Sequence, residues 1–279
     1  PPSQWRRYAA LDRSLRGPGS AEDAAVALQV SSLKTFGRRM YPLALRLLHE
    51  HDEGRLATTE LLGSLEQLQS LLLRRTVVGV STERLVARLC RAAAVSRDAL
   101  VHAIARITPS DERTRVGLKY STLPHPAYVL ARLAGDVDTS SLDLEHIVPL
   151  APSDDWSPDG IQRWADLTED QQNSYRALAP TLGNLSLLER DLFDRAFDAS
   201  FPIKRGIYDT SAITITRDVA EIEAWSTAEI AARTQALTEL FLTVWRRPAV
   251  VSIDDDDLTP ILDARKRRGW PRGWQREFD

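Results

Sequence analysis

Residues 142–150 read LDLEHIVPL, and the interpretation of the whole chain depends on this stretch. Two leucines alternate with Asp143 and Glu145, which is the period of a half-buried β-strand. His146 ends the alternation, and a short apolar run then closes at Pro149. The pattern predicts a strand with one histidine at its end. That histidine is either an ordinary strand residue or half of a metal-dependent catalytic site.

A second strand is predicted at residues 182–189, LGNLSLLE, which open with a Gly-Asn turn. Residues 191–201 are predicted to form a helix, and residues 210–216, TSAITIT, a short extended segment. An antiparallel pair of strands followed by a helix would bring His146, Asn184 and a helix carboxylate close together. Such a group has a chemical use, because a neutral histidine accepts a proton from water and carboxylates hold Mg²⁺.

The rest of the chain is predicted to be mostly helical. Residues 21–120 carry apolar residues at helical spacing, with Thr58 or Thr59 and Ser96 as helix starts. Further helices are predicted at 125–136 and, as one long helix or a pair interrupted near Ser226, at 219–247. Short connections favour helices that pack as antiparallel neighbours. The pattern therefore predicts a mainly α fold.

Composition excludes some classes of protein and site. The chain has 279 residues and a formal net charge of −3, so any surface that attracts nucleic acid must be local. The single cysteine, Cys90, excludes an intrachain disulfide and a cysteine zinc cluster. No apolar run reaches the length of a membrane span and the N-terminus lacks a signal-peptide pattern, so we expect a cytoplasmic protein with no membrane partner.

The C-terminal tail changes composition. It has four aspartates at 254–257, followed by RKRRGWPRGWQRE at 265–277. Arg267 and Arg268 belong to this basic segment, which also contains Trp270 and Trp274. Basic residues bind phosphate and tryptophans stack on bases, so the tail is a candidate DNA contact. Two alternatives stay open: the acidic and basic parts pair with each other, or the tail docks on another domain.

Several motifs in order resemble a known family. They are EHIVP at 145–149, GNLSLL at 183–188, FPIK at 201–204 followed by Tyr208 and Ser211, and later Trp225, Ile230 and Arg233. Together they resemble the C-terminal nuclease domain of the GmrSD-type restriction endonucleases, which are HNH or ββα-metal (His-Me finger) nucleases, over about residues 120–247. The high arginine content suits an SspE-like member. The resemblance implies a helical bundle with a small ββα-metal core. It divides the chain into a helical linker or bundle at 1–120, an HNH nuclease domain at 121–249 and the tail at 250–279.

The resemblance also implies roles for single residues. His146 matches the general base and Glu145 the acidic metal ligand, with Asp143 in reserve. The family has an asparagine on the helix after the second strand as another metal ligand. This chain has none there, so Asp194 is the nearest candidate and Asp191 its rival.

The other implied roles concern orientation and phosphate binding. Asn184 matches the central asparagine of HNH, which orients the histidine or the loop. Lys204 matches a family lysine that could bind a phosphate, and Arg233 either binds phosphate or supports the site.

The function expected from the resemblance is that of a metal-dependent DNA endonuclease of a phage-restriction system, with Mg²⁺ or Mn²⁺ as cofactor. One such site cuts one strand per encounter, so nicking of double-stranded DNA is expected. The family's N-terminal domain uses nucleotide and carries a DGQQR motif, which this sequence lacks, so that domain is the expected partner in a longer protein. Two alternatives remain: a catalytically inactive helical interaction or regulatory module, and an RNase that uses the same site.

Overall fold

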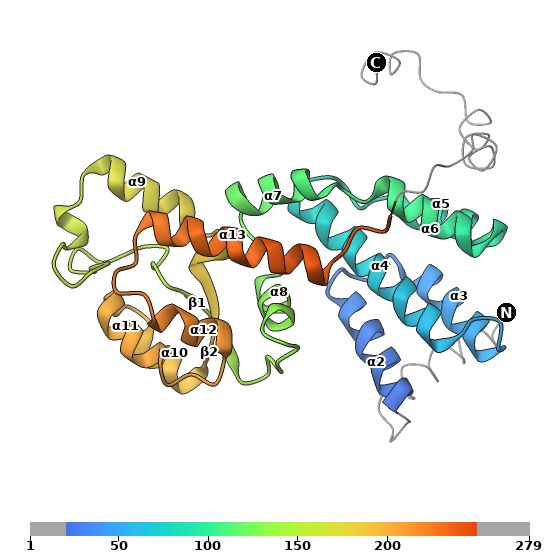
Figure 1. Cartoon of the computed structure of the whole chain (residues 1–279), viewed down its shortest axis with the longest axis horizontal. Helices are drawn as coiled ribbons and strands as arrows, with labels where there is room; N and C mark the ends of the chain where they lie inside the picture. The colour runs from blue at the N-terminus through green and yellow to red at the C-terminus, as the bar shows by residue number, and fades with distance from the viewer. Residues whose placement is uncertain (1–20, 250–279) are drawn as a thin grey trace, which may run out of the picture. The chain divides into compact units, whose positions relative to one another are not determined.

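Residues 21–249 are described by a computed structural model of the chain, which is mainly helical (Figure 1). Its single sheet within these residues has two strands. The described chain divides into two compact units. One is formed by the residues up to Arg75, by Ser81–Pro109 and by the residues from Arg247 onward, the other by Thr76–Val80 and Ser110–Arg246. The predicted tail, with Arg267 and Arg268, lies outside the described residues. None of the helices that the structure describes is long and apolar enough to cross a membrane.

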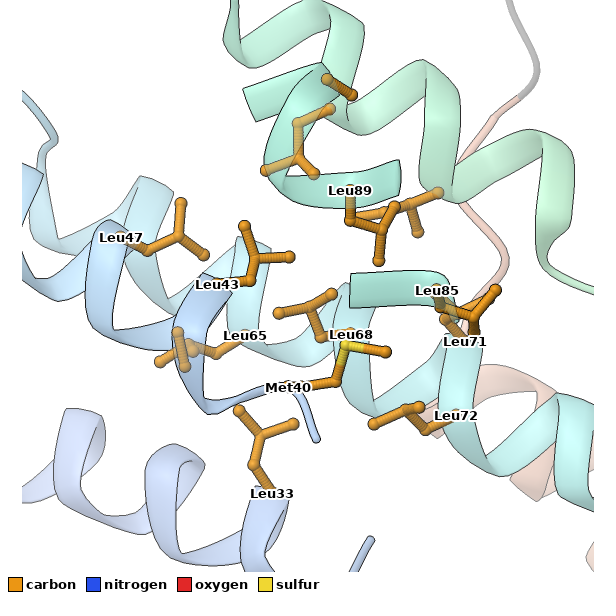
Figure 2. Packing of buried hydrophobic residues seen from close by; sticks show 14 of the residues in the cluster. Leu33, Met40, Leu43, Leu47, Leu65, Leu68, Leu71, Leu72, Leu85 and Leu89 are labelled. Atoms are coloured by element: carbon orange, nitrogen blue, oxygen red, sulfur yellow. The ribbon is translucent and has the colours of Figure 1, made fainter. Parts of the chain in front are cut away.

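The first unit is a set of helices around a leucine core. It contains α2 (Ala21–Lys34), α3 (Tyr41–Asp52), most of α4 (Thr58–Val77), α5 (Leu85–Val95) and α6 (Arg97–Ile107). Leucines spaced three and four residues apart on α4 pack against side chains from α2, α3 and α5 (Figure 2). Ser96 begins α6 as predicted, since its side chain accepts a hydrogen bond from the Ala99 N–H.

The second unit holds both strands. Its helices before the second strand are α7 (Asp111–Tyr120), α8 (Pro126–Leu133), η1 (Trp164–Asp166), α9 (Glu169–Leu178) and η2 (Leu182–Asn184). After that strand come α10 (Arg190–Ala196), α11 (Phe201–Tyr208), α12 (Thr214–Ala220) and α13 (Thr227–Val244). The second unit includes the chain from Ser110 onward, whereas the sequence suggested a domain boundary between residues 120 and 121. Helix α7 belongs to this unit because it packs on α13.

The two predicted strands are confirmed. Strand β1 (Leu142–His146) pairs antiparallel with β2 (Leu185–Glu189), and the register sets His146 opposite Leu185 and Glu145 opposite Ser186. Helix α10 follows β2 without a gap, so the order is strand, strand, helix. Alternation along β1 sends the Glu145 and His146 side chains to opposite faces of the two-stranded ribbon.

The segment after β2 differs from the prediction in two places. The helix predicted at 191–201 ends at Ala196, and α11 begins afresh at Phe201 with Pro202 in its first turn. The prediction of an extended segment at 210–216 was wrong, because α12 begins at Thr214. Short apolar runs do not separate strand from helix by period alone. Here the buried side chains of Ile215 and Val219 are spaced for a helix face, and α12 packs on β2.

Gly183 lies where η2 meets the long helix α13. A Cβ atom at this position would come within 2.2 Å of both the Ile230 carbonyl oxygen and Thr234 Oγ1. The Gly183 N–H donates to Thr234 Oγ1 at 3.1 Å. Only a glycine allows this approach, which places the start of β2, and Asn184 with it, against α13.

Candidate active site

His146 lines a pocket of about 370 Å³ at the end of β1. Helix α10 and the turn after it supply Phe193, Phe197 and Asp198, and the chain after the strand supplies Leu150 among others. The histidine is half-buried, and its pKa is lowered, first by burial and then by the nearby charge of Lys204. A lowered pKa keeps the imidazole neutral at neutral pH, which is the form that accepts a proton.

Asn184 holds the chain that follows His146. Its side chain is fully buried. The Oδ1 atom accepts from the Val148 N–H at 2.9 Å and from the Trp225 indole N–H at 3.1 Å. The Nδ2 atom donates to the carbonyls of Val148 and Ala179, each at 2.9 Å. The Asn184 carbonyl also accepts from the Ile147 N–H at 3.0 Å. All these bonds fix the backbone just beyond the histidine, so the structure supports a role in orienting the loop.

Glu145 lies at the centre of a buried network. Lys204 Nζ donates to Glu145 Oε1 at 2.6 Å and to the His146 carbonyl at 2.9 Å. The Tyr208 hydroxyl donates to the same Oε1 at 2.5 Å. Burial lowers the pKa of Lys204, against the opposing effect of Glu145, and burial followed by the Glu145 charge holds the pKa of Tyr208 well above its usual value.

Of the predicted acidic metal ligands, Asp143, Asp191 and Asp194 are not among the residues that line the pocket. Asp143 pairs with Arg190, Oδ2 to Nε at 3.2 Å. Asp191 and Asp194 are exposed on α10, and neither is among the described residues that line the pocket.

Asp198 is the acidic residue that sequence reasoning missed. It follows the end of α10 and lines the pocket together with Glu145 and His146. The prediction of one continuous helix over 191–201 hid it, because the chain turns after Ala196. Pro202 in the FPIK motif was the signal in the sequence, because a proline favours a helix start and a helix break before it. That break could have placed Asp198 in a turn.

Arg233 supports the second strand from α13. Its guanidinium donates to the carbonyls of Gly183, Leu185 and Ile215 at 2.7, 2.8 and 2.9 Å. Burial lowers its pKa to about 10, which leaves the group charged at neutral pH. Of its two predicted roles, the contacts correspond to support of the site.

The lining of the pocket contains few side chains that could bind a metal. Within residues 21–249, no group of three or more His, Cys, Asp or Glu side chains is gathered to hold a metal. Glu145 and Asp198 are both among the residues that line the pocket, and the hydrogen bonds from Lys204 and Tyr208 to Glu145 are both made to Oε1. Mg²⁺ is commonly held by one or two carboxylates, with waters and substrate phosphate completing its shell.

Residues 109–240 match the family model described as GmrSD restriction endonucleases, C-terminal domain. This segment is a GmrSD C-terminal domain. The match contains both strands, the pocket and most of α13, and so agrees with the resemblance seen in the motifs. No curated protein sequence matches the chain. Membership of the GmrSD C-terminal domain family indicates a function related to restriction endonucleases, with DNA as the substrate; the match does not single out an SspE-like member.

Proposed function

We propose that this GmrSD C-terminal domain is a metal-dependent DNA endonuclease of the HNH type that nicks double-stranded DNA. The observation that carries the proposal is the half-buried His146, with its lowered pKa, in a pocket that is also lined by Glu145 and Asp198. The proposal extends to phage DNA as the target and to a nucleotide-using N-terminal domain as the partner, both of which follow from the resemblance alone.

In this mechanism His146 takes a proton from the attacking water. Desolvation keeps its imidazole neutral, and Lys204 and Asn184 hold the carbonyl and the N–H of the peptide unit that follows its Cα atom. Asp198 and Glu145 would hold Mg²⁺ or Mn²⁺. A divalent cation supplies Lewis-acid polarisation of the scissile phosphate and stabilises the leaving oxyanion.

The test is conversion of supercoiled plasmid to open circles with Mg²⁺, with Mn²⁺ and with EDTA. We expect EDTA to abolish cleavage and His146→Ala to slow it by about 10²-fold or more. Asp198→Ala should do the same, while Asp194→Ala, which replaces an exposed aspartate outside the pocket, is the matched control. Full Mg²⁺-dependent cleavage by His146→Ala would refute the mechanism. Labelled RNA in the same assay distinguishes an RNase.

An inactive interaction module is the second candidate, and the burial of Glu145 against Lys204 favours it, since a buried carboxylate that is already paired with an ammonium group is a poor metal ligand. Mn²⁺ binding measured by electron paramagnetic resonance separates the two. An inactive module would bind Mn²⁺ no better than Asp198→Ala does. Binding that Asp198→Ala abolishes would favour the nuclease.

A further inference from the structure

We infer that Lys204 is a positioning residue of the proposed nuclease site: it fixes the backbone of His146 and the carboxylate of Glu145, and it does not contact a DNA phosphate. The inference rests on the proposed function. It differs from the role that the sequence suggests for this lysine, which is binding phosphate as a point charge.

The Lys204 ammonium group is too deeply buried to reach a DNA phosphate. The Lys204 side chain is 0 % exposed and its Nζ points inward, to Glu145 Oε1 and to the His146 carbonyl. An ammonium group has three donors, and two of them are already bound inside the protein. To meet a phosphate, Nζ would have to leave both partners and leave the Glu145 carboxylate buried without its counter-charge, which is strongly unfavourable.

The hydrogen bond from Lys204 to the His146 carbonyl fixes the backbone at the end of strand β1. The ladder of β1 and β2 ends at the pair His146 and Leu185. At this point the His146 carbonyl is held by Lys204, and the next N–H, that of Ile147, by the Asn184 carbonyl. Helix α11 and Asn184 therefore hold the two polar groups of one peptide unit, the one that follows the His146 Cα atom, and this fixes the backbone from which the imidazole projects.

Lys204 and Tyr208 bind the same carboxylate oxygen of Glu145. Lys204 and Tyr208 lie four residues apart on α11, so they are neighbours on one face of that helix. Both donate to Glu145 Oε1, and the carboxylate therefore cannot rotate freely. Burial raises the pKa of Tyr208, which keeps its hydroxyl a donor at all ordinary pH values.

The experiment compares Lys204→Met with Arg205→Met, an exposed arginine at the next position of the same helix. Turnover and KM are measured on supercoiled plasmid with Mg²⁺. Affinity for a duplex oligonucleotide is measured in EDTA over a series of salt concentrations. We expect Lys204→Met to lower kcat by about 10²-fold, as displacement of a catalytic group does, with KM and the salt dependence unchanged. The imidazole resonances of His146, assigned with His146→Ala, should shift in Lys204→Met and stay in place in Arg205→Met.

A phosphate contact would give another result. Loss of one phosphate contact lowers the slope of log affinity against log salt by about 0.9 and weakens binding. A reduced slope in Lys204→Met, with kcat retained, would overturn the inference.

Tyr208→Phe removes only a hydroxyl and decides the question if Lys204→Met fails to fold. A lower kcat with a shifted His146 signal and an unchanged salt slope supports positioning, whereas an unaltered kcat and signal overturns it. If the unmodified chain cleaves no DNA with any metal, the proposed function fails. The salt slope and the His146 signal then still decide the role of Lys204.

Discussion

Replacing Asn184 by alanine removes four hydrogen bonds from the interior of the second unit. The four partner groups are the N–H and carbonyl of Val148, the carbonyl of Ala179 and the indole N–H of Trp225, and all three residues are buried. A buried polar group that loses its partner costs about 1–3 kcal/mol. At the lower end of that range, four such groups lower the free energy of unfolding by about 4 kcal/mol. This is a large part of the roughly 5–15 kcal/mol that stabilises a typical domain.

Urea unfolding followed by tryptophan fluorescence measures the effect, because four tryptophans lie in the second unit: Trp156, Trp164, Trp225 and Trp245. Asn173→Ala, at an exposed position of α9, is the control and should change the free energy by less than about 0.5 kcal/mol. Asn184→Asp keeps the two acceptor bonds of Oδ1 but loses both donors, so it should still be strongly destabilised. A loss below about 1 kcal/mol for Asn184→Ala would refute the assignment of these bonds.

Three further predictions concern glycine packing, protonation and the buried ion pair. Gly183→Ala should lower the free energy of unfolding by about 1–3 kcal/mol, because its Cβ overlaps α13. Gly206→Ala, where a Cβ meets nothing within 4 Å on helix α11, should raise it by about 0.5–1 kcal/mol; equal urea midpoints for the two variants would contradict the packing argument. Since the pKa of His146 is lowered in the folded chain, the unfolded chain binds the proton first, and stability in EDTA should fall as the pH drops below about 6.5. His146→Gln should reduce this loss of stability. Urea unfolding of the unmodified protein and of His146→Gln between pH 7.5 and 5 tests this, and the same pH dependence of stability in both proteins would contradict the prediction. Lys204→Met should destabilise the protein by about 3–5 kcal/mol, and adding Glu145→Gln should recover part of that loss; additive losses in a double-mutant cycle would show that the pair does not interact.

The ribbon could be predicted from the sequence because its signals are local. Alternation in LDLEH and the Gly-Asn turn before LSLLE lie within a few residues, and the structure pairs these two segments. The helices with clear 3–4 spacing were predicted for the same reason. The segments at 191–201 and 210–216 were harder, since seven to eleven residues with mixed apolar spacing suit more than one conformation. Packing against β2 favours the helical conformation of α12, and Pro202 lies in the first turn of α11.

Some residues of the candidate site could likewise be predicted from sequence motifs, and others could not. The motifs pointed to His146 and Asn184, and the fold sets both at one end of the ribbon, with Asn184 holding the backbone beyond the histidine. They also pointed to Asp194 and Asp191 on the helix after the second strand, and both lie on α10. The turn after Ala196 adds Asp198 to the lining of the pocket.

By itself, the sequence determined a mainly helical chain, a two-stranded ribbon in which β1 ends at His146, and a match of residues 109–240 to a restriction endonuclease domain, because periodicity, turns and motifs are properties of neighbouring residues. The tertiary structure decided which charges meet. Glu145 and Lys204 are 59 residues apart in the chain, and nothing local in either segment shows that they share a buried site. Burial of a charge depends on every element packed around it, so the partner of Glu145, and with it the role of Lys204, could be assigned only once β1 and α11 had been placed together.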